Sequence, residues 1–117
     1  MKRYLVEVPF VEKANGHLRT DYRYFAVYAR GEGSARKKVL RGLEGEFVAA
    51  RCTARAVADG EETRLQALIA GAKARLPRLE EKAEAPNSTL ADCARVMMLY
   101  RNIEENEKQL AALVACR

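Results

Sequence analysis

Arginine at alternating positions of two predicted strands gives this sequence its clearest candidate chemistry, the binding of anions. Side chains an even number of residues apart in a strand point to the same side of a sheet. Each strand contributes such a pair, and the candidate residues are Arg19, Arg23, Arg51 and Arg55. The rigid fork of a guanidinium holds a phosphate or a carboxylate through two hydrogen bonds. If the strands are aligned, we expect a flat basic patch; the alternative is a solvated strand face that Glu12 and Asp21 partly neutralise.

Tyrosines on the second of these strands form another candidate surface. A two-residue turn at Asn15-Gly16 pairs positions whose numbers sum to 31, which places Glu12 opposite Arg19. One face of this hairpin then holds the apolar pairs of Tyr4 with Val27 and Val6 with Phe25. The other face holds Tyr22, Tyr24 and Tyr28 together with Glu7 and Lys13. Exposed tyrosines could stack on bases or anchor a protein interface; the alternative is that the long helices cover this face.

A cluster of cations, Arg36-Lys37-Lys38, falls in the predicted first turn of a short helix that Ser34 would cap. Cations at a helix N-terminus oppose the helix dipole, and an anionic ligand would reverse that effect. Gly31 and Gly33 would allow a ligand to approach closely, but the phosphate-loop pattern is absent. The alternative is a solvated run of charge.

Residues for catalysis are missing from the sequence. Its one histidine, His17, lies beside the predicted turn with no acid close to it in sequence. No group of His, Cys, Asp or Glu has the spacing of a metal site, and the acidic pairs at 80–81 and 104–105 are adjacent residues that do not face one another on a helix. We therefore expect no enzymatic activity, no cofactor and no metal. The three cysteines (Cys52, Cys93 and Cys116) are widely spaced and odd in number, which favours reduced thiols.

The elements that would position these residues begin with a β–β–α–β order. Period-two alternation predicts strands at 3–13 and 17–30, joined at Asn15-Gly16, because a type I′ turn needs positive φ at both central positions. A helix follows from Ser34, with Gly45 expected just beyond its end. A third strand is expected over 46–57.

Two long helices are predicted beyond a hinge at Asp59-Gly60. Leu65, Ile69, Ala72, Leu76, Leu79 and Ala83 form a heptad stripe. Pro77 falls within it, so either the helix kinks there or a new helix starts. Pro86–Ser88 marks a break, and Thr89 with Asp92 resembles a capping box that starts the next helix. A second stripe of Cys93, Val96, Tyr100, Ile103, Leu110 and Val114 then continues, with Glu107 as its polar member.

The predicted fold class is α+β: a small antiparallel β-β-α-β sheet module over 1–58, then a long antiparallel helical hairpin over 59–117, packed as one unit. Positive charge separates these parts, since the first has twelve Lys/Arg against six Asp/Glu and the second has nine against ten. The length of 117 residues suits one domain, and no apolar run reaches the roughly 18 residues of a membrane span. The hairpin is too apolar to cover itself, so it would cover the sheet or a second copy.

The basic β–β–α–β unit, with its scattered tyrosines in a short Ala/Arg-rich chain, resembles the small proteins of phages and mobile elements, including anti-CRISPR proteins. The resemblance lies in size, charge and element order over residues 1–58, and it transfers no functional residue. It implies a non-enzymatic inhibitor of a host nucleoprotein defence complex, acting in the bacterial cytoplasm on an acidic protein surface or on guide RNA. One alternative is a module that binds RNA or DNA directly. Another is a structural protein that forms a homodimer through its C-terminal helix.

Overall fold

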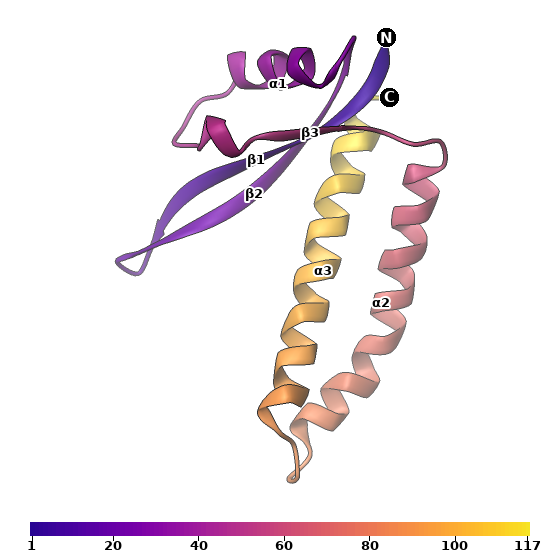
Figure 1. Ribbon diagram of the computed structural model, residues 1–117. Helices are drawn as coiled ribbons and strands as arrows, with labels where there is room; N and C mark the ends of the chain where they lie inside the picture. The colour runs from indigo at the N-terminus through magenta and orange to yellow at the C-terminus, as the bar shows by residue number, and fades with distance from the viewer. The chain divides into compact units, whose positions relative to one another are not determined.

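A long β-hairpin opens the structure, a computed structural model that describes residues 1–117 (Figure 1). Strand β1 (Lys2–Ala14) and strand β2 (His17–Ala29) are antiparallel, and Val6 pairs with Phe25 as the turn predicts. Asn15 and Gly16 have φ of 52° and 79°, the left-handed values that a type I′ turn needs. The predicted register is therefore confirmed, because two residues of suitable chemistry determine the turn and the turn determines the pairing.

The third strand is much shorter than the predicted 46–57. Strand β3 (Thr53–Ala56) pairs with β1, Phe47 forms only an isolated bridge to Phe10, and the 3-10 turn η1 (Ala49–Arg51) lies between them. The sheet order is β2-β1-β3, which makes β1 central. Pro9 has no backbone N–H for a continuous ladder, and its carbonyl accepts the Val48 N–H at 2.9 Å. Pairing with the third segment is accordingly interrupted at this point.

Helix α1 (Glu32–Arg41) packs on one face of the sheet and completes its core. Ala35 and Val39 of α1 join the buried alternate residues of β1, together with Cys52. The core residues from β1 are Tyr4, Val6, Val8 and Phe10. The predicted helix limits were wrong at both ends: Gly31 is the N-cap in place of Ser34, and Gly42 closes the helix before Gly45. Gly31 is extended and its carbonyl accepts the Ala35 N–H at 3.0 Å, so the helix starts one turn earlier.

Two long helices form the predicted antiparallel hairpin. Helix α2 (Glu61–Glu84) and helix α3 (Leu90–Ala115) share a buried cluster of Ala72, Leu99 and Ile103, with Leu76 and Leu79 packed against it. Lys73 on α2 pairs with Glu107 on α3 at 3.2 Å. The seam on α3 differs from the predicted stripe, because Leu99 is buried whereas Cys93 and Tyr100 are exposed. Both faces of this helix are apolar, and packing, not spacing, selects the buried one.

The ends of these helices follow local sequence. Thr89 Oγ1 accepts the Asp92 N–H at 3.3 Å, and Asp92 Oδ2 accepts the Thr89 N–H at 3.0 Å, which confirms the predicted capping box. Helix α2 runs through Pro77, so of the two alternatives the start of a new helix at this residue was wrong.

The chain divides into two compact units. One contains Met1–Asp59 together with Ala111–Arg117, and the other contains Gly60–Leu110. The last residues of α3 therefore belong with the sheet: Leu113 is fully buried, and its carbonyl lies 3.5 Å from an Arg3 guanidinium nitrogen. None of the helices is both long enough and apolar enough to cross a membrane.

Candidate functional site

The four sheet arginines do not form one patch. In β2, Arg19 pairs with Glu12 and Arg23 pairs with Val8, so both project from the face that α1 covers in part. Arg55 pairs with Leu5, whose side chain belongs to the opposite face. Arg51 lies in η1, outside any strand. The expected basic patch was wrong, because β1 separates the two strands and the third strand is too short to include Arg51.

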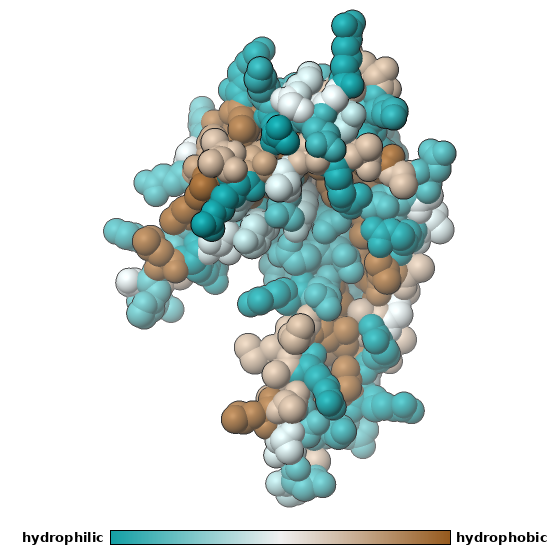
Figure 2. All heavy atoms as spheres, in the orientation of Figure 1, coloured by the Kyte–Doolittle hydropathy of each residue, from teal (hydrophilic) through white to brown (hydrophobic).

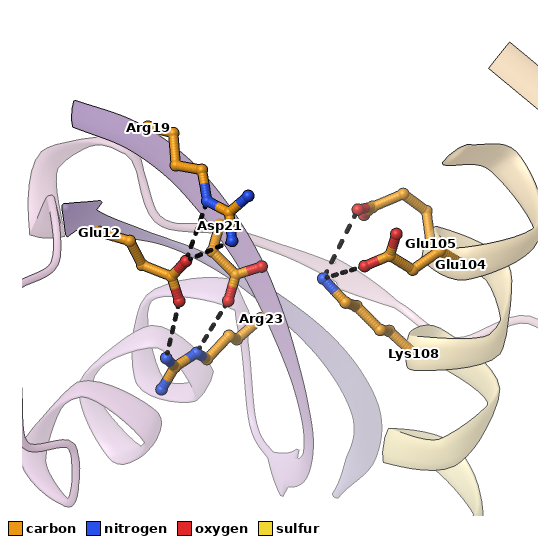
Figure 3. A network of polar contacts seen from close by, with 7 residues as sticks. All are labelled: Glu12, Arg19, Asp21, Arg23, Glu104, Glu105 and Lys108. Atoms are coloured by element: carbon orange, nitrogen blue, oxygen red, sulfur yellow. Dashed lines mark hydrogen bonds and ion pairs between the residues drawn. The ribbon is translucent and has the colours of Figure 1, made fainter. Parts of the chain in front are cut away.

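The two arginines that do share a face are neutralised there (Figure 3). Glu12 Oε2 accepts hydrogen bonds from Nε and Nη2 of Arg19, both at 3.2 Å. Arg23 reaches Glu12 at 3.6 Å and Asp21 at 3.2 Å, and its guanidinium lies 4.1 Å from the centre of the Phe10 ring. Two acids thus match two bases, and Arg23 also covers a buried aromatic ring. This arrangement is the solvated, neutralised strand face that the sequence left open as the alternative.

Acidic and basic residues also neutralise one another on the helical hairpin. Lys108 lies 3.5 Å from Glu104 and 3.8 Å from Glu105, within α3 itself (Figure 3). Asp92 lies 3.7 Å from Lys82 and from Arg95. Residues 60–110 contain eight cations against nine acids, so this part of the chain has no excess positive charge.

The tyrosines occupy the predicted face of the hairpin. Tyr24 pairs with Glu7 and Tyr22 with Pro9, and both pairs lie opposite the face of Val6 and Val8. Tyr22 and Tyr28 are 41% and 45% exposed, whereas Tyr24 is half-buried. Two exposed rings six residues apart do not form a continuous stacking platform, since a strand rises about 3.3 Å per residue.

Helix α1 brings together cations that form no ion pair. Lys37 and Arg41 are exposed, and neither forms an ion pair; together with Lys38, Gly33 and Ser34 they line a shallow concavity of about 530 Å³. Hydrophilic side chains project from the part of the molecule that contains α1 (Figure 2). Lys38 donates a hydrogen bond from Nζ to the Tyr28 carbonyl at 2.9 Å. Helix α1 thus presents a group of exposed, unpaired cations beside one concavity.

The prediction that Arg36-Lys37-Lys38 lie in the first turn of the helix was wrong. The helix begins at Glu32, so these cations lie in its second turn, and the first turn contains the favourable acid. Lys38 and Arg41 lie in the last turn, where cations complement the dipole. These cations therefore do not oppose the dipole at the start of the helix; Lys37 and Lys38 remain exposed candidates, whereas Arg36 is half-buried and does not line the concavity.

Titratable groups that could act chemically are not gathered in one place. Burial raises the pKa of the Cys52 thiol, against an opposing effect of nearby Arg36. Cys93 is exposed on α3, and all three cysteines are free. His17 is exposed at the start of β2. No group of three or more His, Cys, Asp or Glu side chains is placed to hold a metal ion.

An apolar surface is exposed on α3, in the helical hairpin that the sequence predicted to be too apolar to cover itself. Leu90, Met97 and Met98 at the start of α3 are 90%, 72% and 63% exposed. Apolar side chains also reach the surface along the helical hairpin in Figure 2. The sequence signal was the width of the apolar face on α3, which exceeds what one partner helix can cover.

Comparison with known proteins assigns no relative. No family model matches the chain, and neither a curated protein nor a solved structure is similar to it.

Proposed function

We propose that this protein is a non-enzymatic binding protein that engages an anionic partner through the cationic face of α1, defined by Lys37, Lys38 and Arg41. The observation that carries this proposal is the difference between two groups of cations. Arg19 and Arg23 on the β-hairpin are matched by Glu12 and Asp21, whereas the exposed Lys37 and Arg41 form no ion pair. A guanidinium and an ammonium on one exposed helix face suit a carboxylate or phosphate surface.

The narrower proposal is that the partner belongs to a bacterial RNA-guided defence complex, which the protein inhibits. Its support is the resemblance in size, charge and element order to anti-CRISPR proteins. An inhibitor with a cationic face would act on an acidic protein surface or guide RNA of the complex, and its site of action would be the bacterial cytoplasm.

Phage plating on hosts with active RNA-guided defence tests this proposal. Expression of the protein should raise the plating efficiency of a targeted phage by orders of magnitude, and the variant Lys37→Glu/Arg41→Glu should lose this effect. Arg75→Glu/Arg101→Glu is a matched control, because both arginines are exposed on the helical hairpin and the change in net charge is the same. Equal loss in both variants would mean that net charge matters and the α1 face does not.

Direct binding of nucleic acid is the second candidate, favoured by the same cations. Binding to single- and double-stranded oligonucleotides should then be detectable at low salt and fall steeply as salt rises, because phosphate contacts release counterions. Absence of binding at low salt would remove this candidate.

Self-association is the third candidate, and the exposed side chains of Leu90, Met97 and Met98 favour it. Light scattering over a range of protein concentrations tests it. A constant monomer mass would remove it, whereas a dimer that Met97→Glu/Met98→Glu dissociates would support it.

A further inference from the structure

Strand β2 is an open edge of the sheet. It pairs with β1 on one side and has no strand on the other. The strand is 13 residues long, and its last six residues, 24–29, contain no charged side chain. Long, uncharged edges readily pair with another extended chain, and proteins usually shorten, charge or cover them.

Three hydrogen bonds show which backbone groups of β2 point outward. On the β3 side of β1, the backbone bonds run through odd-numbered residues, namely Arg3, Pro9 and Val11. The even-numbered residues of β1 therefore bond to β2, where their partners are odd-numbered because paired positions sum to 31. The N–H and C=O groups of even-numbered Ala26 thus point away from the sheet. Tyr28 is also even-numbered, and its carbonyl points outward in the same way, because it accepts a hydrogen bond from Lys38 Nζ outside the sheet.

A groove runs along this part of the edge. It has a volume of about 350 Å³ and is mostly apolar. Tyr24–Val27 form its floor, Val39, Gly42 and Leu43 line one wall, and Ala112, Ala115 and Cys116 line the other. We call it the edge groove. An added strand would lie with its backbone against Ala26 and with alternate side chains directed toward the two walls.

Charge around the edge groove selects its occupant. The segment 30–41, which contains α1, has five cations against one acid, and 111–117 has one cation and no acid. A second copy added through β2 across a two-fold axis would bring both α1 helices to the same side of the joined sheet. Two segments of net charge +4 would then repel one another, whereas an acidic strand would be attracted.

We propose that the edge groove binds an extended acidic segment of a partner protein, which adds to β2 as a fourth strand with its apolar side chains between the walls. Acidic residues at the ends of that segment pair with Lys38 and Arg41. The inference deepens the proposed function, on which it rests for the anionic character of the partner.

A short acetylated peptide of sequence EEVTVTVEE tests the inference by amide NMR of the protein. The peptide should slow hydrogen exchange at the Ala26 N–H, and the cationic analogue KKVTVTVKK should not. N-methylation of the peptide at one set of alternate residues should abolish binding, and N-methylation at the other set should leave it intact. Equal effects of both sets, or no binding of the acidic peptide at millimolar concentration, would overturn the proposal.

The variant Ala26→Pro removes the outward N–H and should weaken peptide binding about tenfold, equivalent to one backbone hydrogen bond at the upper end of its usual range. Thr20→Pro is the matched control, because the backbone N–H of Thr20 also points away from β1 but Thr20 lies outside the groove. The N-methylated peptides provide the same test on the unaltered protein if Ala26→Pro does not fold.

Other occupants give different results. A concentration-dependent dimer that Ala26→Pro dissociates would assign the edge to a second copy, and slowed exchange at Ala26 with oligothymidylate alone would assign it to nucleic acid; either would overturn the proposal. Peptide binding that depends on Ala26, together with no effect on phage plating, would contradict the inhibitor function while supporting the groove. If Lys37→Glu/Arg41→Glu loses the effect on phage plating but the peptide does not bind the unaltered protein, the inhibitor function would be supported and the edge groove contradicted.

Discussion

Arg23 and Lys37 show that the neighbours of a cation decide whether a partner can use its charge. Arg23 lies between Glu12 and Asp21 and over Phe10, so its replacement by alanine would uncover a buried ring. Substitution of Arg23 would therefore affect the packing of the sheet as well as its charge. Lys37 has no such neighbours, which makes it the better position for charge reversal.

Asp92 provides a prediction about pH at the same scale. The hydrogen bond from the Thr89 backbone lowers the pKa of its carboxyl below the ordinary 3.8, aided by Lys82 and Arg95. A carboxyl with a depressed folded-state pKa stabilises the protein fully above its unfolded pKa, and this contribution is lost as pH falls through the folded pKa. Urea unfolding should therefore show Asp92→Asn to be more destabilising at pH 6 than at pH 3.

The variant Thr89→Ala is the control for this prediction. The Thr89 hydroxyl that this substitution removes does not titrate, and the backbone N–H of residue 89 that binds Asp92 is retained. We expect it to destabilise the protein by about 1 kcal/mol at both pH values, as loss of an N-cap usually does. If the destabilisation by Asp92→Asn is also the same at both pH values, the lowered pKa of the Asp92 carboxyl would be contradicted.

At the scale of elements, α1 shows how one turn of helix changes an electrostatic conclusion. With its start at Ser34, three cations oppose the dipole; with the start at Glu32, they do not. The extended backbone of Gly31 and its carbonyl bond to Ala35 determine the start.

Pro77 within α2 leads to the second prediction. It is exposed, and it removes one backbone hydrogen bond from the interior of a continuous helix. Pro77→Ala should raise the free energy of unfolding by up to about 3 kcal/mol in urea denaturation. Gly71→Ala on the same helix is the reference: open space surrounds its Cβ position, and a gain of about 1 kcal/mol is expected from helix propensity alone. A gain from Pro77→Ala no larger than this reference would mean that the helix has adapted to proline.

At the scale of the whole molecule, the two compact units do not follow the chain order of the elements. Residues 111–117 at the C-terminus belong to the unit that begins at Met1. Positive charge follows the same division: the sheet-containing unit has thirteen cations against seven acids, and the other has eight against nine. The cationic surface and the edge groove both lie in the first unit.

Leu113 gives the third prediction, which tests this membership. Its side chain is fully buried although it lies near the end of the chain. Leu113→Ala should lower the free energy of unfolding by about 2–5 kcal/mol, because it removes buried methyl groups and leaves a cavity. Val114→Ala is the control at the next position, where the side chain is 43% exposed, and it should change stability by no more than about 0.5 kcal/mol. Similar effects of both substitutions would contradict the burial of Leu113.

Local chemistry alone determined several features of this protein. Asn15-Gly16 predicts the turn, and the turn predicts every pair of the hairpin, because a two-residue loop leaves one register. Thr89 and Asp92 predict the start of α3, since the bonds of a capping box join residues three apart. The two periods of the hydrophobic pattern predict the α+β class.

Only the tertiary structure decided which candidate residues meet. The pairing of Arg55 with Leu5 places Arg55 on the opposite face from Arg19 and Arg23, and β1 separates the two strands; no local signal in the sequence encodes this register or the order of strands. The edge groove likewise needs α1 and residues 112–116 beside the same stretch of β2. Both features depend on contacts between distant segments, whose energies come from burial that no short stretch of sequence contains.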